Sequence, residues 1–379
     1  MPEINPVLSQ VGIGFAAFLA PPGPEVIRFT VGQPDFGTPQ PVVDEAKAAL
    51  DRGETAYTRP QGTVALCEAV QQHLTQFDIN VDANDVVVTP GCKQALFYGM
   101  MAVLAPGDEV LPLSPAWPSY DGMVRLTGAL PVHVPVRRDN YHPDFDELEA
   151  HVNENTKAII LNTPNNPTGA VYTPEETKRL VDFAVKHDLW ILDDMIYSTL
   201  VWTDVGYTSP CAFEGGSERT ITIGGWSKGW AMTGWRLGWI TGPTNVMDGV
   251  KVVNVSSATH VPTFLMPAAA KALTLSEEVQ VMKDAFAERR VLMHEGLSTL
   301  PGFVVPEPEG AFYILCDITG TGLTDIEFAH QALEHAQVQV IPGSLMKGGE
   351  GLIRISYATS IANIHEGVRR LRGWLESRA

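Results

Sequence analysis

Residues 224–239 read Gly224-Gly-Trp-Ser-Lys-Gly-Trp-Ala-Met-Thr-Gly-Trp-Arg-Leu-Gly-Trp239. The stretch directly follows the β-branched run Thr220–Ile223, so Lys228 is expected just beyond a strand, among small and aromatic residues. Partial removal from water there would lower the pKa of Lys228 toward the free amine that Schiff-base chemistry requires. Arg236 follows eight residues later and can return to the same cleft. Taken alone, the segment is equally compatible with a surface turn that carries a solvated lysine.

Short apolar runs alternate with helical patterns on both sides of this stretch. The helical patterns cover 93–104 and 175–187, and the second opens with Thr173-Pro174, a good N-cap and first-turn pair. The apolar runs are Val86–Val88, Val110–Leu113, Ala158–Leu161, Trp190–Leu192, Thr220–Ile223 and Leu237–Ile240. This alternation predicts an α/β fold with a mostly parallel sheet covered by helices on both faces. Ligands of such sheets bind at the carboxyl ends of the strands.

Polar residues follow several of these strands. Asp194 and Tyr197 come after one strand, and Asn162-Thr-Pro-Asn-Asn-Pro-Thr-Gly169 comes after another. After a third, Gly91 opens a helix whose first backbone N–H groups can hold a phosphate. No G-x-G-x-x-G or G-x₄-G-K-[ST] motif occurs, so neither a dinucleotide nor ATP explains these parts. They describe instead a cofactor with an aldehyde, a ring nitrogen, a phenolic oxygen and a phosphate.

Composition excludes several other functions. The 379 residues carry 26 Lys and Arg against 44 Asp and Glu, a net charge of −18 that disfavours binding to nucleic acid or anionic membranes. Four widely spaced cysteines and ten scattered histidines form no CxxC or HExxH motif, so no disulfide framework or metal site is expected. No apolar run approaches the ~20 residues that span a bilayer. We expect a soluble, cytoplasmic protein.

The two ends of the chain lack the regular alternation. Residues 1–45 are rich in proline and glycine, whereas the last hundred residues combine a long charged helix near 276–297 with further strands and helices. We therefore expect an N-terminal segment, 1–45, that contributes to a small domain. A large cofactor-binding domain, 46–275, and a C-terminal small α+β domain, 276–379, should follow and pack closely together.

Taken together, these motifs resemble the class I/II aminotransferases of fold type I, which depend on pyridoxal 5′-phosphate (PLP). The matching motifs run from Gly32-Gln-Pro-Asp-Phe36 to Arg354-Ile-Ser-Tyr-Ala-Thr-Ser360, so the resemblance covers nearly the whole chain. The chain is most similar to the subgroup that holds the prokaryotic aspartate aminotransferases. The resemblance implies a mostly parallel seven-stranded sheet in the large domain and a smaller α+β domain built from both termini.

The resemblance also implies how the cofactor ring is bound. Lys228 would hold PLP through a Schiff base and shuttle a proton between the substrate Cα and the cofactor. Asp194 would pair with the pyridinium nitrogen and keep it protonated, which makes the ring an electron sink. Tyr197 and Asn166 would hydrogen-bond the phenolic oxygen. Trp117, in Pro-Ala-Trp-Pro-Ser-Tyr120, would stack on the ring.

At the phosphate, the resemblance assigns Arg236 and the backbone amides of Cys92 and Lys93. Tyr57 matches a residue that reaches the phosphate of the neighbouring subunit. The expected active unit is therefore a homodimer with active sites at the subunit interface.

For the substrate, the resemblance assigns Arg354 to the α-carboxylate, helped by Asn166 and the backbone of Gly32. Lys93 matches a lysine that reaches the distal carboxylate in aspartate-specific relatives. This favours aspartate or glutamate with 2-oxoglutarate or oxaloacetate. The same lysine also occurs in relatives with aromatic or aliphatic substrates, so those substrates remain the alternative.

The chain departs from the family pattern at two places. Cys92 replaces a small residue, and only its backbone is expected to matter. Gly225 stands where many relatives carry a serine, so a hydroxyl that binds phosphate is missing there, and the role of Ser227 stays open. Asp193 beside Asp194 is expected to be structural.

Two further functions share this fold. PLP-dependent C–S lyases and related enzymes use the same lysine, because PLP stabilises any carbanion at Cα. Pyruvate and ammonia released without a 2-oxo acid acceptor would indicate a lyase. A PLP-sensing transcription regulator would need an N-terminal DNA-binding module, and only about thirty residues without a basic patch precede Gly32.

Overall fold

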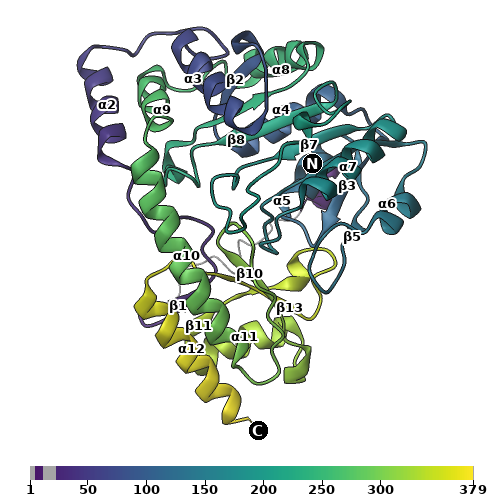
Figure 1. Cartoon of the computed structure of the whole chain (residues 1–379), viewed down its shortest axis with the longest axis vertical. Coiled ribbons are helices and arrows are strands. Elements are labelled where there is room, and N and C mark those ends of the chain that lie inside the picture. The colour runs from purple at the N-terminus through teal and green to yellow at the C-terminus, as the bar shows by residue number, and fades with distance from the viewer. Residues whose placement is uncertain (1–4, 12–22, 379) are drawn as a thin grey trace, which may run out of the picture.

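A computed structural model of the chain describes residues 5–11 and 23–378. Part of the predicted N-terminal segment, 1–45, therefore lies outside the described residues. A large sheet with its helices forms the upper part of the molecule in Figure 1, and two small sheets with the C-terminal helices form the lower part.

The large sheet has the strand order β2-β9-β8-β7-β6-β3-β4, and β5 also pairs with β3. Only β9 runs antiparallel to its neighbours, β2 and β8, while the other pairs are parallel. The strands are β2 (Val86–Thr89), β3 (Glu109–Ser114), β4 (Leu130–Pro131), β5 (Val134–Pro135), β6 (Thr156–Leu161), β7 (Trp190–Asp194), β8 (Thr220–Gly225) and β9 (Gly238–Thr241). The predicted α/β fold with a mostly parallel sheet is confirmed.

One edge position of this sheet is divided between two short strands. β4 pairs with the start of β3 and β5 pairs with its end. Pro131 and Pro135 each end one of these strands. Because proline lacks the N–H that a further neighbour would need, it is confined to sheet edges. The predicted seven strands thus become eight.

Helices cover both faces of the large sheet. Leu192 and Ile160 pack in one core cluster with α4, α5 and α8, whereas Ile191 and Ile159 pack on the opposite face with α7. The helices around this sheet are α2 (Gln40–Asp51), α3 (Val64–Leu74), α4 (Cys92–Val103), α5 (Ser119–Leu126), α6 (Phe145–His151), α7 (Pro174–Lys186), α8 (Thr244–Ser257) and α9 (Met266–Ala272). Among the described residues, no helix is long and apolar enough to cross a membrane.

The predicted helix start at Thr173 is confirmed. The Thr173 hydroxyl accepts a hydrogen bond from the Glu176 amide, and the Glu176 carboxylate accepts one from the Thr173 amide. This reciprocal capping box satisfies two backbone donors at the start of α7.

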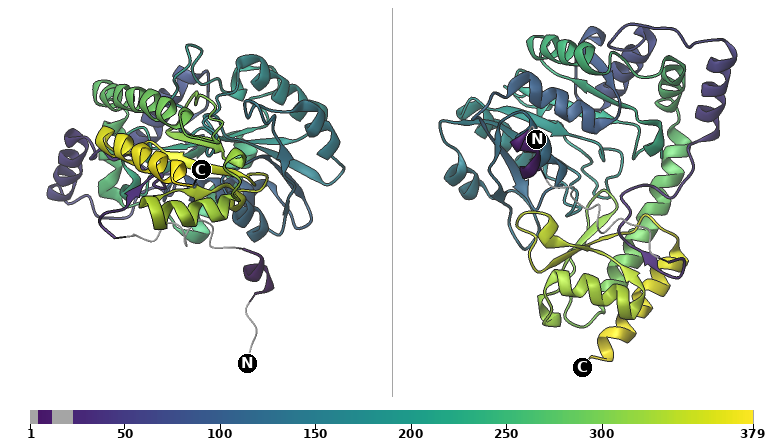
Figure 2. Two further views of the ribbon diagram at one scale, coloured as in Figure 1. Left: turned by 90° about the horizontal axis from the view of Figure 1, so that it is seen from below. Right: turned by 180° about the vertical axis from the view of Figure 1, so that it is seen from behind.

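The C-terminal part combines residues from both ends of the chain. β1 (Ile27–Arg28) pairs in parallel with β11 (Val338–Gln339), and β10 (Tyr313–Asp317), β13 (Leu352–Ser356) and β12 (Ile341–Pro342) form an antiparallel sheet. α10 (Ser276–Ser298), α11 (Asp325–Ala336) and α12 (Ile361–Glu376) lie close to one another in Figure 2. Phe29 is buried with all three helices in one apolar cluster. A Cβ at Gly367 would overlap the Phe29 ring, so α12 packs directly on the N-terminal segment.

Candidate active site

One cavity lies where the carboxyl ends of the parallel strands face the C-terminal sheet. Its volume is about 450 Å³, and its walls come from the ends of β7 and β8, the start of α4 and strand β13. Every predicted site residue except Tyr57 lines it: Gly32, Cys92, Lys93, Trp117, Asn166, Asp194, Tyr197, Lys228, Arg236 and Arg354. The strand ends thus gather the residues that the sequence singled out.

Lys228 follows the end of β8 and reaches across the cavity. Its Nζ donates a hydrogen bond to the carbonyl oxygen of Gly32 in the segment after β1. Burial lowers the pKa of Lys228 from 10.5 to about 8, the Cys92 thiol opposes this shift, and the guanidinium groups of Arg354 and Arg236 add to it. A large share of the Lys228 side chains is therefore neutral near pH 8, as a nucleophilic amine requires.

Asp194 ends β7 and is buried at the cavity wall. The Tyr120 hydroxyl donates to its Oδ2 at 2.7 Å, and the Ile196 amide donates to its Oδ1 at 3.4 Å. Burial raises the pKa of Asp194 to about 6, against the lowering effect of these two hydrogen bonds and of Lys228. The carboxylate is consequently mostly ionised at pH 7 and held in one orientation.

Asp193 does not line the cavity. Successive side chains of a strand point to opposite faces, and Asp193 accepts a hydrogen bond from the Tyr207 hydroxyl at 2.5 Å. Burial raises the pKa of Asp193 to about 7. Of the two adjacent carboxylates, Asp194 is the one that faces the cavity.

Arg354 lies in β13 and is only 2% exposed. Its Nη1 donates to Oδ1 of Asn166 and its Nη2 donates to the Thr30 carbonyl, both at 3.0 Å. Its guanidinium carbon lies 4.6 Å from the centre of the Tyr313 ring. A guanidinium held in this way is suited to binding a carboxylate with two parallel hydrogen bonds.

Tyr197 shares its hydroxyl with a second tyrosine. The hydroxyl oxygens of Tyr197 and Tyr313 lie 2.9 Å apart. Burial raises the pKa of both phenols, so both are neutral at physiological pH. The pair links the turn after β7 to the first residue of β10.

The start of α4 and Arg236 form the opposite end of the cavity. Gly91 has a φ of +85° and provides no side-chain cap for the helix. A Cβ at Gly91 would lie 2.5 Å from the Arg236 guanidinium, so the arginine lies directly against the helix start. Free helix-start amides beside a cation favour an anion such as phosphate.

Known proteins resemble the chain along nearly its full length. Residues 24–371 match the family described as aminotransferase class I and II. The chain belongs to this family. An aspartate aminotransferase of Pyrococcus abyssi is 41% identical over 354 residues, covering 92% of this chain and 91% of that protein. An aromatic-amino-acid aminotransferase 2 of Thermococcus litoralis is 39% identical over 361 residues, covering 93% of this chain and 92% of that protein.

Solved structures agree with this family. An aspartate aminotransferase from Thermus thermophilus with maleate superposes with a TM-score of 0.93 at 34% identity, covering 99% of this chain and 100% of that chain. Class I and II aminotransferases depend on PLP, and so does this chain. The cavity fits that cofactor: it combines an amine of lowered pKa, a buried carboxylate, a phenol, and a helix start with an arginine beside it.

Cys92 and Gly225, the two positions at which this aminotransferase departs from the family pattern, lie next to each other. A Cβ at Gly225 would lie 2.5 Å from the Cys92 sulfur, 2.8 Å from the Gly238 Cα and 2.9 Å from the Leu237 carbonyl oxygen. The Cys92 thiol donates to the Gly224 carbonyl, with sulfur and oxygen 2.9 Å apart, and burial raises the pKa of this thiol. Packing therefore leaves no room for a serine at position 225.

Tyr57 is the one predicted site residue that lies outside the cavity of this aminotransferase. Its side chain is 92% exposed and makes an edge-to-face contact with His260 at 5.6 Å between ring centres. The single chain therefore does not bring Tyr57 to the other site residues.

Other lining residues of this aminotransferase were not predicted. Tyr120 and Tyr313 hydrogen-bond Asp194 and Tyr197, and Arg28 and Thr30 line the cavity from β1 and the residues after it. Tyr120 carries a detectable signal, because it lies three residues after Trp117 at the start of a helix. Arg28, Thr30 and Tyr313 carry none that one sequence reveals.

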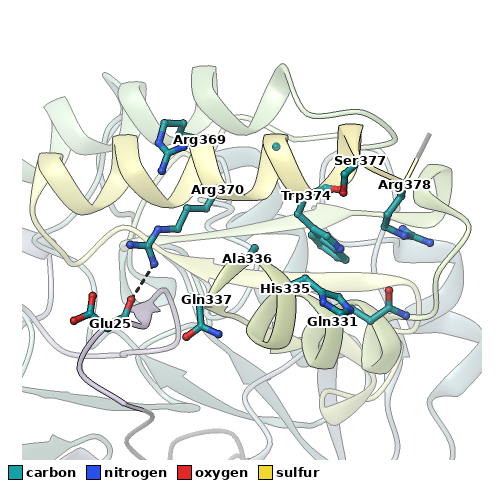
Figure 3. Close-up of a pocket in the computed structure, with 11 residues that line it drawn as sticks. Glu25, Gln331, His335, Ala336, Gln337, Arg369, Arg370, Trp374, Ser377 and Arg378 are labelled. Carbon is teal, nitrogen blue, oxygen red and sulfur yellow. Dashed lines mark hydrogen bonds between the residues drawn. The ribbon is translucent and has the colours of Figure 1, made fainter.

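A larger cavity of about 810 Å³ lies away from the strand ends, between α11, α12 and Glu25 (Figure 3). Its guanidinium groups are engaged locally: Arg370 donates to the Glu25 carbonyl and, like Arg369, to Glu366. The described residues hold no cluster of three metal-binding side chains.

Proposed function

We propose that this aminotransferase takes aspartate or glutamate as amino donor, with 2-oxoglutarate or oxaloacetate as acceptor. One observation carries the proposal: two cations, Arg354 and Lys93, occupy different walls of one cavity. The Lys93 Nζ lies 4.8 Å from the centre of the Trp117 ring, which holds it at the cavity. A dicarboxylic substrate needs one cation for each carboxylate.

The names of several relatives support this substrate class. The Pyrococcus abyssi protein is an aspartate aminotransferase, and the Thermus thermophilus enzyme was solved with maleate, itself a dicarboxylate. The Thermococcus litoralis relative acts on aromatic amino acids, so aromatic donors are the second candidate. With an aromatic donor, only the backbone amide of Lys93 would take part, by binding the phosphate. Trp117 would then pack against the side chain of the substrate.

For the cofactor ring we propose the roles that the family resemblance implies. Lys228 would hold PLP covalently and carry a proton to and from the substrate Cα. When bound, PLP supplies an electron sink for charge that develops at that carbon. Asp194 would hold the proton on the ring nitrogen, and Tyr197 and Asn166 would hydrogen-bond the phenolic oxygen.

For the phosphate and the substrate we likewise follow the resemblance. The amides of Cys92 and Lys93 together with Arg236 would bind the phosphate. Arg354 would bind the substrate α-carboxylate, helped by Asn166 and the backbone of Gly32. Lys228 donates to the Gly32 carbonyl, so the lysine lies in direct contact with the segment that would help to bind the substrate.

Lys93→Ala is expected to lower kcat/KM for aspartate about a hundredfold, because a charge-paired carboxylate is worth ~2–3 kcal/mol. The fall for alanine and phenylalanine should be much smaller. Steady-state kinetics with the three donors measure this difference. Lys178→Ala, which removes an exposed lysine paired with Asp182, should leave all three values unchanged. An equal fall for all donors would remove the support for a dicarboxylic substrate.

We further propose a homodimer in which Tyr57 contacts the phosphate bound by the partner subunit. The exposed Tyr57 supports this, as do Val252 and Val255, two exposed apolar side chains on α8. Exposed aromatic and apolar side chains of this kind are typical of an interface.

Tyr57→Phe should weaken PLP binding to the apoenzyme by about ten- to a hundredfold, because a hydrogen bond to a charged group is worth ~1.5–3 kcal/mol. A fluorescence titration measures this change, and light scattering gives the mass in solution. A monomer that binds PLP normally, or a Tyr57→Phe variant with unchanged affinity, would contradict the shared site.

We also propose that the enzyme works in the cytoplasm. All four cysteines are free, which is usual in a reducing compartment. Two of them, Cys67 and Cys316, are buried.

A further inference from the structure

His133 connects two hydrogen-bonding partners that flank the Trp117 segment. It lies between β4 and β5, with its side chain 14% exposed. Its Nδ1 lies 2.5 Å from the Ser114 hydroxyl, and its Nε2 lies 2.9 Å from Oδ1 and 3.1 Å from Oδ2 of Asp121. One imidazole therefore bridges residue 114 and residue 121.

The carboxylate partner sets the direction of one bond, and the direction of the other then follows for a neutral ring. An ionised carboxylate only accepts, so the Nε2 of His133 must carry the hydrogen that Asp121 receives. In the neutral ring, Nδ1 is then an acceptor and takes the hydrogen of the Ser114 hydroxyl. In this form the His133 ring supplies one hydrogen-bond donor, Nε2, and one acceptor, Nδ1, side by side.

The bridged residues belong to a short segment that faces the cavity. Ser114 is the last residue of β3, and Asp121 lies in the first turn of α5. Between them, Trp117 and Tyr120 both line the cavity, and Tyr120 donates to Asp194. The rings of Trp117 and Tyr120 meet edge to face, 5.4 Å apart.

Apart from the Tyr120 hydrogen bond to Asp194, the described start of α5 has no side-chain cap. The residue before α5 is Pro118, which forms no side-chain cap. The link from Asp121 through His133 to Ser114 takes the place of such a cap and ties the helix start back to the sheet. Serine, histidine and aspartate in this order also occur in hydrolases, but Ser114 is only 4% exposed and is poorly placed to attack a substrate.

We infer that His133 is a positioning residue that holds the Ser114–Asp121 segment, and through it Trp117 and Tyr120, in place for the cofactor ring. The inference rests on the proposed role of Trp117 and Asp194 at that ring. His133 itself lines a different cavity, with Arg138 and Lys347, and is not among the residues that line the candidate active site.

The test compares His133→Ala with His133→Gln. A glutamine amide presents an acceptor and a donor side by side, so it can restore both hydrogen bonds. We expect His133→Ala to raise the Kd of the apoenzyme for PLP about tenfold, since two hydrogen bonds are lost. It should also weaken the visible circular dichroism of the bound cofactor, and His133→Gln should restore most of both signals.

Two controls make the outcome specific. His151→Ala removes a histidine in the last turn of α6 that bonds the Glu147 carbonyl and makes no bond to the segment, so it should leave PLP binding and dichroism unchanged. Ser114→Ala and Asp121→Ala each remove one end of the bridge and should reproduce part of the His133→Ala effect, so they test the inference even if His133→Ala fails to fold.

The inference is overturned if His133→Ala binds PLP with the wild-type Kd and dichroism. It is also overturned if the variant only lowers the melting temperature of the apoenzyme, because His133 would then be structural alone. Failure of the proposed function is a different result: the wild-type protein itself would not take up PLP on Lys228.

Discussion

Lys228→Ala is expected to abolish transamination, with a loss of at least on the order of 10⁴-fold, because general acid–base catalysis alone contributes up to that factor. The substitution removes both the covalent link to the cofactor and the proton carrier. The lysine is prepared for this role by burial, which lowers its pKa to about 8. Turnover of the purified variant, measured with aspartate and 2-oxoglutarate, checks the loss.

The same lysine should carry the cofactor in the native enzyme. Borohydride reduction followed by peptide mapping is expected to find PLP on the peptide that contains residue 228. The rate of PLP uptake by the apoenzyme should rise with pH around a midpoint near 8, because the neutral amine attacks and the pKa is about 8 rather than 10.5. Label on another lysine would refute the assignment, and Lys271→Ala, on α9, serves as a control with unchanged uptake.

Asp194→Ala is expected to lower kcat/KM by at least about a thousandfold, since a preorganised electrostatic partner contributes several kcal/mol to the transition state. PLP should still bind, because Lys228 and the phosphate site are intact. The Tyr120 hydroxyl, now without its carboxylate, cannot replace the lost anion. Steady-state kinetics and the absorption spectrum of the bound cofactor report the two effects separately.

Asp193→Ala provides the matched control for this prediction. Asp193 is as deeply buried as Asp194 but bonds Tyr207 on the other face of β7, so its loss should lower the melting temperature and leave kcat/KM nearly unchanged. The reverse pattern, with Asp193→Ala inactive and Asp194→Ala active, would show that Asp193 rather than Asp194 pairs with the ring nitrogen.

Much of the fold follows from the sequence because the buried strands are short, apolar and regularly spaced. The predicted runs at 158–161, 190–192 and 220–223 are the cores of β6, β7 and β8. The helices α3, α5, α6, α8 and α9 were not predicted. α8 mixes small and β-branched residues with weak apolar periodicity, and α9 is short and rich in alanine, so their positions depend on packing against α4 and α2.

The candidate site was predictable for a geometric reason. Residues that follow parallel strands meet at one edge of the sheet, so Asp194 and Lys228 had to be near neighbours. Contacts between distant segments, such as that of Tyr313 with Tyr197 or of His133 with Asp121, leave no spacing signal in one sequence. The role of Tyr57 depends on a second chain, which no pattern within the first can contain.

The crowding at Gly225 has a consequence for how this enzyme could evolve or be engineered. Because Cys92 and strand β9 both occupy the space that a side chain at 225 would need, the serine found in many relatives cannot simply be introduced. A smaller residue at 92 would clear the sulfur but leave the backbone at Gly238 in the way. Exchanging glycine for serine at position 225 would therefore require simultaneous changes at β8, at β9 and at the start of α4. A single substitution at any one of these places would leave the phosphate site poorly packed.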